Sequence, residues 1–319
     1  MRKAIVAICV ALMAVSFSGI ARAAFTDLGA GSRPVGLGGA FVAVADDVNT
    51  VFYNAAGVSL LKKKEITAMY APLYVGLTEG SVADMFVGAG ASFGKFGVGI
   101  GYLGRSASAK AGEGIEAGYS ETSVGLTAAA DVGSMVLKMP ISIGVGLKML
   151  MVGYKENEYT KIDPLFAEKT SASNFGVDVG LLAKPIKLIS VGLALKNLNM
   201  PSVAIADTED KVPLAVDAGA AITLGGIGPI QDLCLAGNFV YSMATVGAMK
   251  GGGGLELWVA KRLLGIRAGF AGGTDGYADL NAGLSISAGP VRLDYALVFP
   301  MGTVEGTSGS HRVALVVGF

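Results

Sequence analysis

The residues whose types and spacing could carry chemistry are charged side chains that stand between apolar neighbours at alternate positions of several short stretches. Side chains of a strand alternate between its two faces, so these charges should all point to the face opposite the apolar one. The candidates are Lys148, Asp178, Lys196, Asp217, Glu256, Arg267, Arg292, Asp294 and Arg312. Acidic and basic residues occur in similar number, which favours mutual ion pairs over a single-sign ring that selects ions. We interpret them as pairs that hold the molecule together; direct selection of a solute is the alternative.

The sequence offers no catalytic constellation. Its single histidine, His311, has Ser310 and Arg312 as neighbours, and adjacent strand residues point to opposite faces, so no hydroxyl is brought to a base there. Cysteines and histidine show no metal-ligand spacing, and the glycines match no phosphate-binding loop. The 25 basic and 25 acidic residues leave no net charge to attract nucleic acid. We therefore expect neither an enzyme nor a cofactor, and no nucleic-acid partner.

A second set of candidates lies in the glycine-rich stretch of residues 24–61, which resembles almost nothing later in the chain. It contains an Asp-Asp-x-Asn cluster and ends in Tyr-Asn-Ala-Ala-Gly. Its candidate residues are Asp46, Asp47, Asn49, Phe52, Tyr53, Asn54 and Gly57. Asp46 or Asp47 is expected to cap a short helix that runs through Phe52, because an Asp at that position accepts hydrogen bonds from the N–H groups of the first turn. A solvated acidic turn is the alternative.

The elements that must position these residues follow from a contradiction in the composition. Hydrophobic residues make up 52% of the chain and charged residues 16%. Yet beyond residue 23 no uninterrupted apolar run reaches the roughly 18 residues that a membrane helix needs. The 48 glycines also disfavour long helices. These observations favour strands over helices.

The first 23 residues indicate export. Arg2 and Lys3 precede an apolar run, and Ala21-Arg22-Ala23 suits signal peptidase, so residues 1–23 are predicted to be a secretory signal. Its removal leaves Cys234 as the one cysteine, which excludes an intrachain disulfide. An exported, apolar chain without helical spans predicts an all-β fold, a closed transmembrane antiparallel β-barrel.

From Lys64 onward the dominant period is two, the period of a strand. About fourteen strands are predicted, near residues 64–73, 85–93, 96–103, 119–130, 140–152, 173–183, 189–196, 214–224, 230–241, 251–260, 264–271, 277–287, 291–299 and 311–319. An even number is what bacterial single-chain barrels have. One face of each strand suits lipid, and the other suits a polar or tightly packed lumen.

The predicted connections alternate in length along the chain. Short connections are expected at residues 94–95, 184–188, 225–229, 261–263 and 288–290, and longer polar ones at residues 104–118, 153–172, 197–213, 242–250 and 300–310, with 131–139 intermediate. Outer-membrane barrels alternate short periplasmic turns with long external loops in this way. A soluble β-sandwich or solenoid, the alternative fold, gives no reason for such sorting. The aromatic last residue, Phe319, is typical of outer-membrane proteins and predicts recognition by the barrel-assembly machinery.

Three stretches resemble a known family. Residues 31–57, from Gly-Ser-Arg-Pro-Val-Gly to Tyr-Asn-Ala-Ala-Gly, resemble the N-terminal signature of the PorV/PorQ group within the wider superfamily of FadL-type outer-membrane channels. The family form has a proline where this chain has Ala55. Val291-Arg-Leu-Asp-Tyr-Ala296 with Gly309-Ser-His-Arg312 resembles the closing hairpin of the family, and Leu195-Lys-Asn-Leu198 is a weaker match. The resemblance implies a barrel of this size with an N-terminal hatch in or beneath its lumen.

The sequence thus predicts a signal peptide at residues 1–23, a hatch or plug segment at residues 24–63 and a barrel at residues 64–319 in the bacterial outer membrane, surrounded by its lipid. Two functions fit. The first is a transport-related barrel for hydrophobic small molecules, gated by the hatch. The alternative is a non-conducting accessory or docking protein of type IX secretion, whose partners would be components of the secretion system, as the PorV resemblance implies.

Overall fold

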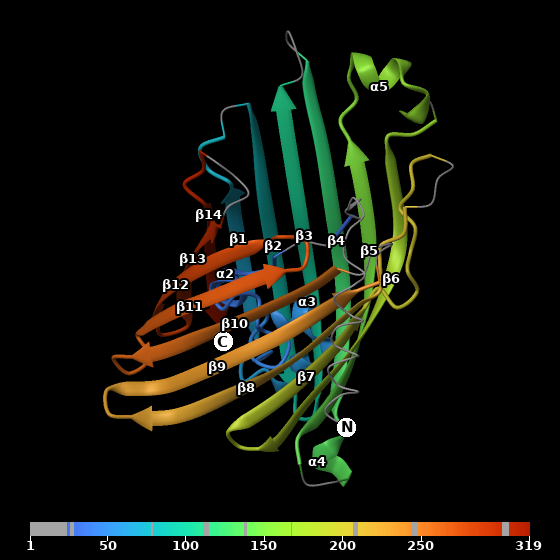
Figure 1. Ribbon diagram of the computed structural model, residues 1–319. Coiled ribbons are helices and arrows are strands. Elements are labelled where there is room, and N and C mark those ends of the chain that lie inside the picture. The colour runs from blue at the N-terminus through green and yellow to red at the C-terminus, as the bar shows by residue number, and fades with distance from the viewer. Residues whose placement is uncertain are drawn as a thin grey trace, which may run out of the picture.

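The computed structural model describes residues 24–25, 29–77, 79–110, 115–136, 139–166, 168–206, 210–243, 248–301 and 306–319. The predicted signal peptide lies outside these residues. Within the described chain, fourteen antiparallel strands follow one another in sequence order and close into a barrel (Figure 1). The prediction of an antiparallel barrel of about fourteen strands is therefore confirmed.

The strands and helices lie in the order expected from the period-two pattern. The strands are β1 (Glu65–Leu73), β2 (Gly80–Phe93), β3 (Phe96–Lys110), β4 (Glu116–Asp131), β5 (Ile141–Tyr154), β6 (Ser171–Ile186), β7 (Ile189–Lys196), β8 (Ala215–Ile227), β9 (Ile230–Ser242), β10 (Ala248–Val259), β11 (Leu264–Gly273), β12 (Ala278–Ala288), β13 (Val291–Pro300) and β14 (Ser310–Gly318). The short helices are α2 (Ser32–Gly36), α3 (Thr50–Tyr53), η1 (Ala55–Leu60), α4 (Gly133–Val136), α5 (Glu158–Ile162) and η2 (Pro164–Phe166). No helix of the described residues is long and apolar enough to span a membrane.

The first and last strands pair to close the barrel. β1 lies antiparallel to β14 with Glu65 opposite Gly318, and beyond the ladder Lys64 and Phe319 exchange two backbone hydrogen bonds of 3.1 and 2.9 Å. Closure leaves no unpaired sheet edge, which is the requirement for a sheet in lipid. The C-terminal strand with its aromatic end is therefore a wall strand of the barrel.

The two faces of the wall differ in side-chain chemistry. On β13, Leu293 and Phe299 are exposed on the outer face, whereas Asp294 is buried on the inner face. On β10, Glu256 and Trp258 are likewise buried inside. The side chains of a strand thus alternate as the sequence predicted: apolar side chains cover the outer surface, and the others pack inside the lumen.

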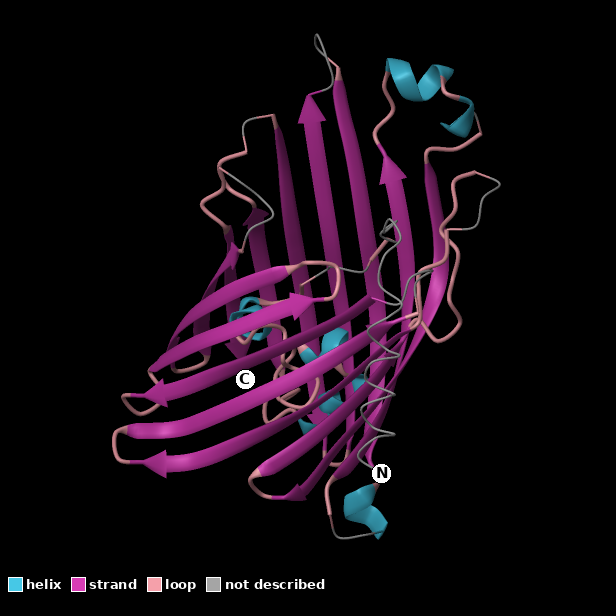
Figure 2. Ribbon diagram, viewed as in Figure 1, coloured by secondary structure: helices cyan, strands magenta, loops and turns pink. Residues whose placement is uncertain are grey.

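Several strands are longer than the sequence predicted. The largest difference lies at residues 104–118, where a loop was predicted and most residues belong to strands. β3 continues to Lys110 and β4 starts at Glu116, with Lys110 opposite Glu116 in the ladder. The apolar-polar alternation stops near residue 104, but backbone pairing does not depend on it and continues into the polar region. Figure 2 shows these long strands at the end of the barrel that carries the longer connections, including α5.

Residues 29–61 of the predicted hatch segment lie inside the ring of strands, where Figure 1 shows α2 and α3 enclosed by the wall. Leu37, Phe41 and Val58 of this segment are fully buried. Leu37 and Phe41 pack with Ala221 and Cys234 of the wall. The apolar core of the molecule is therefore the contact between the hatch and the inner wall.

Candidate functional site

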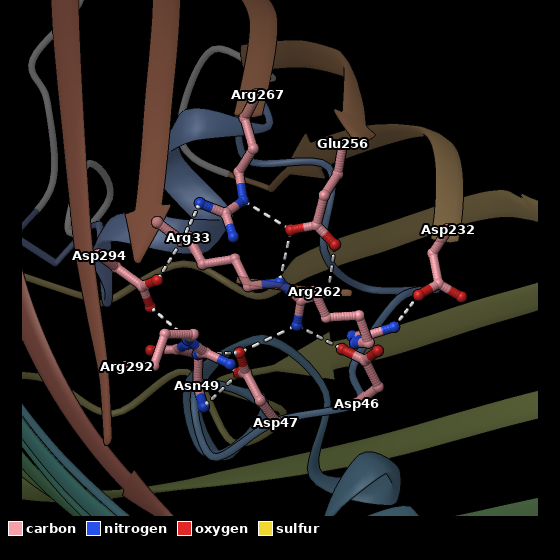
Figure 3. Close-up of polar contacts among 11 residues, drawn as sticks. Arg33, Asp46, Asp47, Asn49, Asp232, Glu256, Arg262, Arg267, Arg292 and Asp294 are labelled. Atoms are coloured by element: carbon pink, nitrogen blue, oxygen red, sulfur yellow. Dashed lines mark hydrogen bonds and ion pairs between the residues drawn. The ribbon is translucent and has the colours of Figure 1, made fainter. Parts of the chain in front are cut away.

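The centre of the candidate site is Arg33, which α2 places inside the barrel with 5% of its surface exposed. Its guanidinium donates from Nε and Nη2 to the two carboxylate oxygens of Glu256, both at 2.8 Å. The remaining nitrogen, Nη1, donates to Asp46 at 2.5 Å and to Asp47 at 2.9 Å (Figure 3). A planar guanidinium bound to a carboxylate through two parallel hydrogen bonds is the strong, geometrically specific form of this contact. Arg33 thus fastens the hatch to β10.

The contacts of Arg33 continue around the wall. Arg267 on β11 donates from Nε to Glu256 at 2.6 Å and from Nη1 to the Ser285 hydroxyl on β12 at 2.7 Å. Ser285 donates to Asp294 on β13. Strands β10 to β13 are thereby joined through side chains beneath α2.

The chain of contacts then returns to the hatch. Arg292 donates to Asp294 at 2.9 Å and to Asp47 at 3.0 Å. Because Asp47 also binds Arg33, the side chains form a closed ring (Figure 3). We call it the anchor ring; its members are Arg33, Glu256, Arg267, Ser285, Asp294, Arg292 and Asp47. It alternates positive and negative groups, so that each buried charge has an opposite charge or a hydroxyl beside it.

The protonation behaviour of the hatch groups reflects this pairing. Burial alone would lower the pKa of Arg33, but the carboxylates of Asp46, Glu256 and Asp47 raise it well above its ordinary value. Burial alone would raise the pKa of Asp47, but the guanidinium groups of Arg33 and Arg292 outweigh it and hold that pKa below its ordinary value. Both hatch groups are therefore ionised at neutral pH.

The structure distributes the predicted luminal charges over several places. It brings Glu256, Arg267, Arg292 and Asp294 together in the anchor ring. The other predicted charges pair elsewhere: Lys148 with Asp178 at 2.7 Å, Lys196 with Asp217 at 3.9 Å, and Arg312 with Asp84 at 3.3 Å. Each of the nine lies in an ion pair, which fits the pairing interpretation better than a single-sign ring.

The predicted helix cap at Asp46 or Asp47 is wrong. α3 begins only at Thr50, its N-cap residue is Asn49, and no side chain caps it. The Asp47 carboxylate accepts from the backbone N–H and the side-chain amide of Asn49 at 3.0 and 2.7 Å, which closes the turn ahead of the helix. Its other oxygen, like Asp46, faces Arg33. Arg33 therefore binds one oxygen of each carboxylate, and the second Asp47 oxygen closes the turn at Asn49 instead of capping α3.

The other hatch candidates shape the segment itself. Asn54 donates to the carbonyls of Val42 and of Leu181 on β6, at 2.8 and 3.0 Å, and its oxygen accepts from Ala56 N–H at the start of η1. Thus an asparagine cap begins this turn without the proline of the family form. A Cβ on Gly57 would lie 2.9 Å from the Ala45 methyl group, so no larger residue fits.

The two aromatic candidates contact the wall and the rest of the hatch. The Phe52 ring meets Phe86 of β2 edge to face, with ring centroids 5.5 Å apart. Tyr53 meets Phe41 in the same way at 5.4 Å, and the Lys196 ammonium lies 5.4 Å from the centre of the Tyr53 ring. They hold the hatch against β2 and β7.

Inward-facing glycines of the wall form the surface on which the hatch backbone rests. A Cβ on Gly254 would lie 2.6 Å from the Leu37 carbonyl oxygen, and one on Gly269 would lie 2.6 Å from the Leu37 carbonyl carbon. Side chains there would push the hatch away. The same close approach occurs at Gly97, Gly144, Gly180, Gly192 and Gly252. The glycine content of the wall therefore has a local purpose in seating the hatch.

Sequence reasoning missed Arg33, Asp84 and Ser285. Arg33 stands in the Gly-Ser-Arg-Pro match. It is the one basic residue between positions 29 and 61, a stretch whose two acidic residues are Asp46 and Asp47, and this charge balance was a usable signal. Asp84 and Ser285 carried no comparable signal, because their roles depend on the partners across the strand ladder. Among the described residues no group of three or more His, Cys, Asp or Glu side chains could hold a metal ion.

Fold and site together define a closed outer-membrane-type β-barrel whose lumen is occupied by its own N-terminal segment. Among solved structures the chain is similar to the CymD monoaromatic hydrocarbon channel, with a TM-score of 0.66, 11% identity and coverage of 93% of this chain and 99% of that one. It is also similar to the Pseudomonas putida toluene transporter TodX, with a TM-score of 0.64, 11% identity, and 92% and 99% coverage. The chain thus shares its fold with these two hydrocarbon transport barrels.

Comparisons of sequence match a smaller part of the chain. The family described as "F plasmid transfer operon, TraF, protein" matches residues 105–253, less than half of the 319-residue chain. The match runs from β3 to β10 and includes none of the hatch. No curated protein matches the chain.

Proposed function

We propose that this protein is an outer-membrane barrel that admits hydrophobic small molecules, with residues 24–63 as a plug that gates the lumen. The observation that carries the proposal is the match of nearly the whole chain to monoaromatic hydrocarbon channels. In this proposal residues 1–23 are a cleaved secretory signal, and the barrel-assembly machinery reads the C-terminal strand.

The interior supports a gated route. The buried hatch presents apolar side chains, among them Leu37, Phe41 and Val58, to the inner wall. Their displacement would open the lumen to a hydrocarbon past the glycines and the small wall residues Ala221 and Cys234 that they now cover. The anchor ring is the contact that such a movement must break.

Uptake across an asymmetric membrane tests the proposal, because a plain phospholipid bilayer lets toluene through unaided. Vesicles with a lipopolysaccharide outer leaflet would carry the wild-type barrel, a variant lacking residues 29–61, and Arg33→Met. We expect faster entry of labelled toluene with the two variants than with wild type. Arg262→Ala, which removes an exposed pair with Asp232, is the matched control and should behave as wild type. A barrel that stays impermeable when residues 29–61 are deleted contradicts the proposal.

A second function, a non-conducting docking protein of PorV type, is favoured by the closeness of the hatch to the wall. The inward-facing glycines and the anchor ring contact the hatch from several strands. A hatch that closes the lumen permanently would need such contacts. Affinity capture from membranes, with identification of exported cargo or secretion components, tests it. Capture of the assembly machinery alone counts against it.

A further inference from the structure

The start of the hatch belongs to a small apolar cluster on the inner side of the barrel. Ala24 is buried, with 9% of its surface exposed, and packs with Leu150 and Val152 of β5 and with Val203 and Val212 between β7 and β8. Residue 24 would be the first residue of the chain after the proposed removal of the signal peptide.

A buried carboxylate faces this start. Glu121 lies on the inner face of β4, is 8% exposed, and accepts the Phe25 backbone N–H at 3.2 Å and the Tyr119 hydroxyl at 2.9 Å. Within the part of the chain that the structure describes, Glu121 has no ion pair. Arg105 stands opposite in the ladder, but two of its nitrogens already bind the two oxygens of Asp84, at 2.7 and 3.0 Å.

Processing would supply the missing cation. Hydrolysis of the bond between residues 23 and 24 adds water, gives Ala23 a carboxylate and turns the amide nitrogen of Ala24 into an ammonium group. An α-amino group has a pKa of about 7.7–8.0 and is largely charged at neutral pH. The Ala24 nitrogen is one residue from the Phe25 nitrogen, and therefore within about 7 Å of the Glu121 carboxylate.

We propose that Glu121 is the binding site for the α-ammonium group of the mature chain and that this ion pair locks the start of the hatch inside the barrel. The inference rests on the cleavage after residue 23 included in the proposed function. Before cleavage the carboxylate is buried without an ion pair, which is costly. After cleavage it is paired, so processing adds a further contact that holds the start of the hatch in the barrel.

Reactivity of the N-terminal amine tests the ion pair without any transport assay. Purified mature barrel is treated at neutral pH with an amine-selective acylating reagent, and the N-terminal peptide is quantified by mass spectrometry. A protonated, buried amine reacts slowly, so we expect the amine of the folded wild type to react on the order of tenfold more slowly than that of unfolded protein. Glu121→Gln keeps the hydrogen-bond acceptor but removes the charge, and should lose most of this protection. Glu116→Gln, at the exposed end of the same strand beside Lys155, should keep it.

Heat-modifiable migration on a gel shows whether Glu121→Gln folds. If it does not fold, a second variant tests the same ion pair. A glycine inserted between residues 23 and 24 moves the ammonium by one residue, leaves Glu121 in place, and should also lose protection. Equal labelling of wild type and the folded variants overturns the proposal. So does a mature N-terminus at any residue other than 24, and neither outcome depends on whether the barrel conducts.

Discussion

Replacing Arg33 with methionine should release the hatch. Methionine keeps an unbranched apolar stem but removes the charge, so Glu256 and Asp47 each lose one buried partner. Removal of one partner from a buried ion pair costs about 3–5 kcal/mol. Here Glu256 keeps Arg267 and Asp47 keeps Arg292, so the cost should be smaller. We expect the substitution to destabilise the seated hatch relative to the open state by about 2–3 kcal/mol. That energy corresponds to a roughly 30- to 150-fold rise in the open fraction.

Chymotrypsin cleavage inside the hatch measures the open fraction, because Phe41 is buried in the seated segment. Mass spectrometry would follow the cut after this residue in the folded barrel, with Arg262→Ala as the control. We expect the cut to form 30- to 150-fold faster in Arg33→Met than in wild type, in proportion to the opening equilibrium. A change of less than about threefold, well below the 2 kcal/mol estimate, would refute the anchoring role.

A double-mutant cycle separates pairing from general damage. Glu256→Gln alone leaves Arg33 and Arg267 without their shared carboxylate, whereas the double variant removes both sides of the contact. The two effects should therefore sum to more than the effect of the double variant. Strict additivity would mean that the Arg33 and Glu256 side chains do not stabilise each other.

Three further predictions use the same cleavage assay. Gly254→Val should place a side chain against Leu37 and unseat the hatch, whereas Gly253→Ala, whose nearest neighbour is 3.6 Å from the added carbon, should leave it seated. Asp47 has a lowered pKa, so its stabilising effect is complete above the ordinary value of about 3.9 and is lost only as pH falls through the lowered folded value. The difference in hatch protection between wild type and Asp47→Asn should thus be constant between about pH 5 and 8 and vanish in stronger acid. Asn54→Ala removes the η1 cap and two hydrogen bonds to carbonyls, and should destabilise the seated hatch by about 1–3 kcal/mol.

Each of these has a clear contrary result. Equal cleavage of the Gly253 and Gly254 variants would show that the close approach to Leu37 is unimportant. A difference between wild type and Asp47→Asn that disappears near pH 6 would show that the Asp47 contribution does not follow a lowered pKa. A fully protected Asn54→Ala variant would show that the asparagine contacts add nothing to the seated state.

The sequence by itself determined the class of fold. Alternation such as that of Leu293, Asp294 and Tyr295 on β13 is a local property, because neighbouring strand residues must face opposite sides. Lipid requires every backbone group to be paired, so an apolar chain with this period is predicted to close into a barrel. Strand ends were predicted less well, as at β3, because pairing persists where the alternation has stopped.

Tertiary structure alone decided which charges meet. Glu256 and Lys148 looked alike in the sequence, each a single inward charge, yet Glu256 joins the anchor ring and Lys148 pairs with Asp178. Arg33 and Glu256 are 223 residues apart, and their contact depends on the path of the hatch across the lumen. The hatch candidates were correctly grouped as one segment, but the partners of Asp47 were not predictable. Local pattern sets the face on which a side chain lies, whereas its partner depends on long-range register and on what fills the barrel.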